Sequence, residues 1–142
     1  MKKIQFNLFF AFMVLITSCS CAGQKLVKTA GDAPKLEQHK NMFIGKPLSV
    51  LLNEIGPTIK MASAEGARSD GYPGFFYFRF VTRKEGNKLR LAKVRPISIF
   101  VYVKEKFVWD KRAKPVADRE KWTEEDVNRY KNLTVVGISV SQ

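Results

Sequence analysis

The cysteines place the first constraint on how this chain can fold. Only Cys19 and Cys21 are present, and both lie near the start of the 142 residues. Everything after Cys21 must fold without a disulfide, so its stability has to come from packing. The chain also has a single histidine, His39, which we expect to be exposed or to pack and not to bind a metal. A zinc finger, a Cys/His metal cage and a Ser-His-Asp triad are therefore excluded.

The first 18 residues have the pattern of an export signal. Lys2 and Lys3 precede an apolar run from Phe6 to Ile16 that only Asn7 interrupts. At 1.5 Å per residue this run is too short to span a hydrocarbon core of about 30 Å. A basic start, a short apolar run and small residues after it are typical of a secretory signal peptide.

The end of this segment resembles the lipobox of bacterial lipoproteins, through Leu15-Ile16-Thr17-Ser18-Cys19. The resemblance implies that the Cys19 thiol receives a diacylglycerol and that Cys19 becomes the new N-terminus. The protein would then be held to a membrane by this lipid. Ser20, in place of an aspartate, implies sorting to the outer membrane, facing the periplasm. The alternative is ordinary cleavage after Gly23, which would release a soluble periplasmic or secreted protein.

The rest of the chain is predicted to form a tether and one domain. Residues 19–31 are short, polar and without apolar periodicity, which predicts a flexible tether that begins at the lipidated cysteine. Residues 32–142 are predicted to form a single domain. A chain of that length buries between roughly 60 and 70% of its unfolded surface, which is enough to fold alone.

Three helices are predicted by their capping residues and apolar spacing. The first covers 34–42, with Asp32 before it as a capping residue. The second covers 47–55, because four apolar residues spaced i, i+3, i+4 and i+7 form one stripe, and Gly56 is expected to end it in a left-handed conformation. The third is short and acidic and begins at Thr123. Residues 61–74 are predicted to be a mobile loop.

Alternating apolar residues predict the strands. A strand over 75–84 should turn one set of side chains to the core, namely Phe76, Phe78 and Phe80. Residues 85–87 are expected to turn and Lys88 onward to return as its hairpin partner. Pro96 should mark a bulge, bend or edge before a strand over 97–104. The last strand, 133–141, should place together Val136, Ile138 and Val140.

These elements predict an α+β fold in which short N-terminal helices pack on an antiparallel sheet of about four strands. A short acidic helix precedes the last strand. Trp109 and Trp122, on either side of a 110–121 loop, are expected to anchor the core or the sheet edge and not to form a carbohydrate platform.

The order of elements over 34–104 resembles the small outer-membrane assembly lipoproteins of the SmpA/OmlA type and the related β-lactamase-inhibitor-like domains. The resemblance is carried by the helix from Gly45-Lys46-Pro47-Leu48 to Ile55-Gly56-Pro57, which precedes the aromatic strand. It implies a similar α+β architecture. The 105–132 connection and the final strand lie outside it.

Two surfaces are candidates for binding. Phe75 and Tyr77 lie on the strand face opposite the core and are predicted to contact a partner protein. The second candidate is a basic hairpin over 79–95, which would bind polyanions. Its cationic residues are Arg79, Arg83, Lys84, Lys88, Arg90, Lys93 and Arg95.

We therefore expect a small, exported, lipid-anchored envelope protein that is a non-enzymatic interaction module and binds another envelope protein. The alternative is a binder of anionic envelope polymers or lipid head groups through the 79–95 hairpin. Catalysis is not expected, because the acids fall mostly in predicted turns or helix starts, where solvation or capping explains them. Neither a cofactor nor a metal is expected. Nucleic acid is not an expected ligand, because the order of an RNA-binding strand motif is missing.

Overall fold

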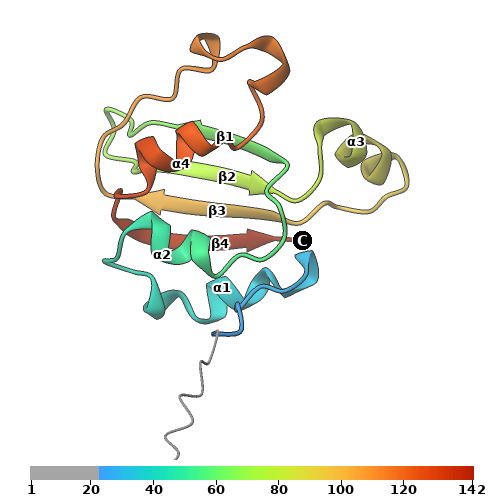
Figure 1. Ribbon diagram of the computed structural model, residues 1–142, viewed down its shortest axis with the longest axis horizontal. Coiled ribbons are helices and arrows are strands. Elements are labelled where there is room, and N and C mark those ends of the chain that lie inside the picture. Colours follow the sequence, from blue (N-terminus) through green and yellow to red (C-terminus); the bar gives the residue numbers. More distant parts are fainter. Residues whose placement is uncertain (1–22) are drawn as a thin grey trace, which may run out of the picture.

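The computed structural model describes residues 23–142; the predicted signal segment, Cys19 and Cys21 lie outside this range. The described chain has the expected α+β fold, a four-stranded antiparallel sheet in the order β1-β2-β3-β4 (Figure 1). Its strands are β1 (Met61–Glu65), β2 (Gly74–Arg79), β3 (Ser98–Val103) and β4 (Val135–Ser141). Its α-helices are α1 (Pro34–Gln38), α2 (Leu48–Asn53), α3 (Arg83–Leu91) and α4 (Glu124–Tyr130). No helix among these residues is long and apolar enough to cross a membrane.

The core lies between one face of the sheet and helices α1, α2 and α4, which lie on the same side of it (Figure 1). On β2 the predicted alternation is confirmed, since Phe76 and Phe78 are fully buried. Burial of each such side chain stabilises the fold by roughly 1.5–3 kcal/mol. The helices contribute buried Leu36 from α1 and Leu48 and Leu51 from α2.

Aromatic rings hold the long connection between β3 and β4 on this core. The Phe76 ring centroid lies 4.7 Å from that of Phe107, 5.2 Å from that of Tyr130 and 5.7 Å from that of Trp122. Trp109 meets Phe76 edge-on at 6.2 Å. The prediction that Trp109 and Trp122 pack on the core is therefore confirmed.

The first helices are shorter than predicted. The helix expected over 34–42 is interrupted at His39, which is exposed and separates α1 from a 3-10 turn at Lys40–Met42. After α2, Gly56 is not left-handed, so that expectation was wrong. Gly56 instead permits a close approach, because a Cβ there would lie 2.8 Å from the Val27 carbonyl oxygen.

The predicted tether is too long at its C-terminal end. Val27 is fully buried and forms a parallel bridge with Ile55. Its N–H donates to the Glu54 carbonyl oxygen at 3.0 Å. Folded structure therefore begins before Gly31, because an apolar residue at position 27 reaches the core.

The predicted 61–74 loop is wrong at its start, where residues 61–65 form β1. The Met-Ala-Ser-Ala-Glu sequence has no β-branched or aromatic residue, so its strand propensity is low. Pairing with β2 decides its conformation, with Ala62 opposite Phe78 and buried.

The predicted 79–95 hairpin is also wrong, because residues 83–91 form helix α3. Thr82 caps this helix: its hydroxyl accepts from the Glu85 N–H, and the Glu85 carboxylate accepts from the Thr82 N–H. The Thr-x-x-Glu capping box is a signal for the start of a helix, and here it prevails over Gly86, which had indicated a turn. The hairpin partner predicted for β2 does not form, and β2 pairs with β3 instead. Pro96 lies in the link between α3 and β3 and is buried.

The last strand deviates from simple alternation. Ile138 and Val140 share one face as predicted, and the structure places them opposite Val101 and Ile99, but the register shifts at the other end of the pairing. There Val103 pairs with Val135, which is fully buried, while Val136 is 41% exposed. The prediction for Val136 is therefore wrong, because a β-bulge puts its neighbour into the core.

One carboxylate ties the end of β3 to the start of β4. Glu105 accepts from the Thr134 N–H at 2.7 Å and from the Thr134 hydroxyl at 2.5 Å. The Thr134 hydroxyl is the main reason that the pKa of Glu105 lies below its ordinary value.

We expect Glu105→Gln to reduce the pH dependence of folding stability. A lowered folded-state pKa contributes stability that is present above the ordinary value of 4.5 and is lost as the pH falls below it. The variant should be about 1 kcal/mol less stable at neutral pH, with the difference shrinking in acid. Urea unfolding across pH measures this. Glu65→Gln, at an exposed site, is the control, and an equal difference at all pH values would contradict the prediction.

Candidate functional site

Four aromatic side chains meet on the sheet face opposite the helices. Phe75 and Tyr77 come from β2, and the register places them across from Tyr102 and Phe100 of β3. Ring centroids are 4.9 Å apart for Tyr77 and Phe100 and 5.8 Å apart for Phe75 and Tyr102. We call these four residues the aromatic patch.

The aromatic patch lies outside the core. All four rings are partly exposed, and none belongs to the buried cluster or to the residues that pack against it. Helices α1, α2 and α4 cover the other face of the sheet (Figure 1). Neighbouring apolar rings left accessible on one face are typical of an interaction surface.

Sequence reasoning singled out Phe75 and Tyr77 but missed Phe100 and Tyr102. In the strand predicted over 97–104, alternation puts Phe100 and Tyr102 on the face opposite Ile99 and Val101. What was missing was the pairing of β2 with β3, because the expected hairpin partner was the basic segment. The structure therefore joins two predicted residues with two that sequence reasoning had not selected.

Basic groups border the aromatic patch at both ends. At one end the Arg79 guanidinium lies 4.7 Å from the Tyr77 ring centroid, and its Nε donates to the Ser98 hydroxyl at 2.9 Å. At the other end is an open cavity of about 480 Å³. Its lining includes Arg68, Tyr72, Lys104, Lys106 and Val136. Arg68 pairs with Asp70 at 3.0 Å. The border of the aromatic patch is thus mainly cationic.

The structure does not collect the predicted basic residues into one ribbon. Arg79 belongs to the open sheet face, whereas the other six lie on α3 or just after it. On α3, Arg83 pairs with Glu120, and Arg90 donates to Asn87. Four more cations form no ion pair within residues 23–142, namely Lys84, Lys88, Lys93 and Arg95.

The end of α3 has an unusual backbone. Lys93 has φ of 59°, the only positive φ of a non-glycine residue in the described chain. Its N–H donates to the Arg90 carbonyl oxygen at 2.9 Å, and the Val94 N–H donates to that of Leu89 at 2.8 Å. This is the helix-ending motif in which glycine is usual, because a Cβ is disfavoured there.

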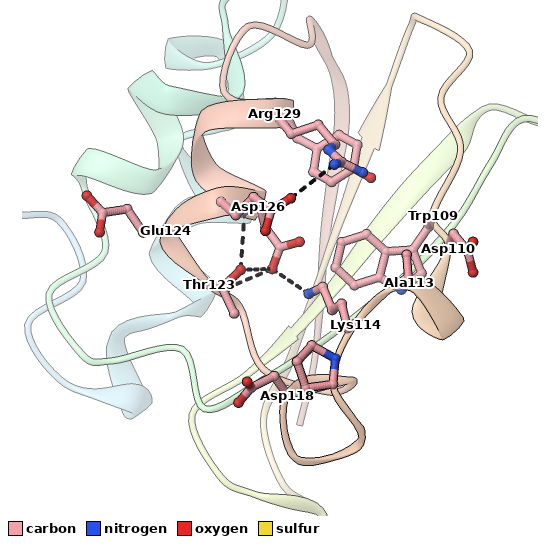
Figure 2. Close-up of a pocket in the computed structure, with 12 residues that line it drawn as sticks. Trp109, Asp110, Ala113, Lys114, Asp118, Thr123, Glu124, Asp126 and Arg129 are labelled. Atoms are coloured by element: carbon pink, nitrogen blue, oxygen red, sulfur yellow. Dashed lines mark hydrogen bonds and ion pairs between the residues drawn. The ribbon is translucent and has the colours of Figure 1, made fainter.

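A second cavity, of about 350 Å³, lies between α4 and the loop before it (Figure 2). Trp109 and Tyr130 form part of its wall, and Lys114 and Asp126 meet inside it. The Lys114 Nζ lies 2.5 Å from a carboxylate oxygen of Asp126, and both side chains are largely buried. The rim carries four further acids, Asp110, Asp118, Glu124 and Glu125.

The buried pair in this cavity has a structural task. Asp126 accepts from the Thr123 N–H and from the Thr123 hydroxyl, both at 2.8 Å, and so completes the cap of α4. Lys114 donates to the Lys121 carbonyl oxygen at 3.0 Å, and its Nζ lies 4.4 Å from the Trp109 ring centroid. The pair thus holds the 111–121 loop against the start of α4. Among the described residues, only Trp109 Nε1 is a buried side-chain polar atom without a hydrogen bond.

Comparison with protein-family models, with curated proteins and with solved structures gives no match to this chain. The resemblance of residues 34–104 to the assembly lipoproteins therefore stays a prediction. Within residues 23–142, no group of three or more His, Cys, Asp or Glu side chains is placed to hold a metal ion. Of the surfaces described, the aromatic patch is the one whose accessible rings have no structural task in the core.

We expect Lys114→Met to destabilise the fold by about 3 kcal/mol, because it leaves Asp126 buried without its counter-charge. Lys111→Met, at an exposed position on the same loop, is the matched control and should change stability by less than about 0.5 kcal/mol. Urea unfolding of both variants measures the difference. Equal stabilities would show that the ion pair does not fasten the loop.

We expect Lys93→Gly to stabilise the fold by about 0.5–1 kcal/mol, because glycine adopts positive φ without the Cβ conflict. Lys84→Gly removes the same charge from within α3 and should destabilise by about 1 kcal/mol. Thermal unfolding of the two variants should therefore move in opposite directions. A loss of stability in Lys93→Gly would contradict the assignment of this helix end.

Proposed function

We propose that this protein is an exported envelope lipoprotein that binds another envelope protein through its aromatic patch and acts without catalysis. The carrying observation is the cluster of Phe75, Tyr77, Phe100 and Tyr102 on an open sheet face, outside the core. Nothing in the packing of the fold requires four rings there.

The chemistry of this face favours a protein partner with a particular surface. Aromatic side chains are enriched at the buried centres of protein interfaces. The cationic border, with Arg79 at one end and Lys104 and Lys106 at the other, favours acidic groups opposite it. The proposed partner therefore presents an apolar patch edged by Asp or Glu.

The proposed location comes from the sequence pattern. The basic start, the short apolar run and the likeness of Leu15 to Cys19 to a lipobox support export and attachment by a lipid on Cys19. Ser20 supports the outer membrane, with the domain facing the periplasm. The likeness of residues 34–104 to the assembly lipoproteins also fits a role that depends on protein contact.

We expect a photo-crosslinking amino acid at position 77 to capture one discrete protein in intact envelopes. The same probe at position 116 is the control, because Val116 is 77% exposed but belongs to the loop between β3 and α4, which lies beyond the edge strand β1 (Figure 1). Phe100→Ala should weaken capture from position 77 by about 30-fold, which is the effect of losing a hot-spot contact worth about 2 kcal/mol.

Circular dichroism must show that Phe100→Ala remains folded. Arg79→Glu and Lys104→Glu should each reduce capture further if the partner surface is acidic. Identical adducts from positions 77 and 116, or capture that is insensitive to Phe100→Ala, would contradict the proposed interface.

A further inference from the structure

We propose that residues 83–95, which comprise α3 and the turn after it, bind the surface of an anionic phospholipid bilayer and insert Leu91 among the lipids. Leu91 is 86% exposed, more than any other large apolar residue of the described chain. Val94, close to it in sequence, is 51% exposed. In Figure 1, α3 lies beyond the ends of the strands, away from the other helices.

The helix turns one face to the domain and the other to solvent. Gly86 faces the domain, since a Cβ there would lie 3.7 Å from Pro96 and 3.8 Å from Val81. Leu89 also faces inward and lines a cavity of about 220 Å³ with Phe80. At 100° per residue, the opposite face carries Lys84, Lys88 and Leu91. Leu91 therefore shares the outward face with two cations.

The charge of this segment favours an anionic surface. Its one acid, Glu85, is engaged by the cap of α3 and by Lys60 at 3.2 Å. Because this acid is engaged, the unpaired cations of the segment remain available to a ligand. Each Lys or Arg close to an anionic membrane strengthens binding about fivefold.

The exposed leucine distinguishes a bilayer from a soluble polyanion. A polyphosphate or an acidic glycan would engage the cations but would leave Leu91 in water. A phospholipid surface offers phosphates and, just beneath them, hydrocarbon, which is the combination that basic amphipathic segments recognise. Lys93 has a positive φ, a backbone conformation that glycine adopts without strain. A lysine at this strained position is consistent with a role for its charge.

The N-terminal part of the described chain passes the base of α3 at Ala30. Ala30 lines the same cavity as Leu89 and Val94. Leu26 and Val27 are held at the end of α2, so the seven residues from Cys19 to Leu26 set the reach of a lipid on Cys19, which is at most about 25 Å when extended. A lipid on Cys19 would therefore keep the domain that carries α3 close to a bilayer. The inference goes beyond the proposed function, because it does not use the aromatic patch.

The test measures insertion at position 91 in the full chain. Leu91→Trp and Val116→Trp are made separately, and the chain without either substitution gives the signal of Trp109 and Trp122 for subtraction. Each protein is mixed with vesicles of phosphatidylethanolamine and phosphatidylglycerol that carry brominated acyl chains. The matched vesicles contain phosphatidylcholine alone. All variants share the same N-terminal segment, so that segment cannot account for a difference between positions 91 and 116.

We expect at least twofold stronger quenching of the introduced indole at position 91 than at 116 in anionic vesicles. This excess should disappear in phosphatidylcholine and at high salt. Lys84→Glu with Lys88→Glu should abolish this excess, whereas Lys111→Glu with Arg112→Glu, on the loop before α4, should not.

Quenching at position 91 that is no stronger than at position 116 would overturn the proposal. So would salt-sensitive vesicle binding without quenching, which would mean contact with phosphates only. If position 91 shows no excess quenching while position 77 still crosslinks to a protein, the membrane proposal fails and the proposed function stands.

Discussion

The register between β2 and β3 determines both the core and the outer surface of this protein. Phe76 lies opposite Val101 and faces the helices, while Tyr77 lies opposite Phe100 and faces outward. Because side chains alternate along a strand, a slip of one residue would exchange the two faces of β2. The buried rings and the aromatic patch are thus two results of one pairing.

The same strand also secures the longest connection of the fold. Phe76 contacts rings that come from residues 107–130, and Phe78 stacks edge-on against Trp122 at 5.0 Å. The Lys114–Asp126 pair then fastens the middle of this connection to α4. A region without strands of its own is held in place by rings that β2 supplies.

Sequence reasoning predicted the elements whose patterns are local. The strand predicted over 75–84 forms as β2 in its first half, with rings alternating between the core and the outer face. The helix predicted over 47–55 forms as the shorter α2, and the acidic helix begins after Thr123 as expected. The class of fold follows from them. Half of the aromatic patch was also predicted, because Phe75 and Tyr77 are separated from the core residues by simple alternation.

The errors occur where tertiary contacts decide the structure or where a local signal was overlooked. The β1 strand has weak propensity and exists because β2 pairs with it. The bulge at Val136 depends on how β4 meets β3. The helix α3 was detectable, since Thr82 and Glu85 form a capping box, but Gly86 and the basic residues after it favoured a hairpin. That error removed Phe100 and Tyr102 from consideration as partners of Phe75 and Tyr77.

The anchoring of Val27 has a mechanical consequence. Hydrogen bonds join this segment to the end of α2: Glu54 accepts from the N–H groups of Leu26 and Val27, and the Gly56 N–H donates to the Val27 carbonyl oxygen. The Val27 side chain is buried beside them. Tension applied to the N-terminal residues is therefore resisted first by this junction and reaches the four strands only after it breaks. A pull from that end would peel away the first residues while leaving the sheet, and both of its faces, intact.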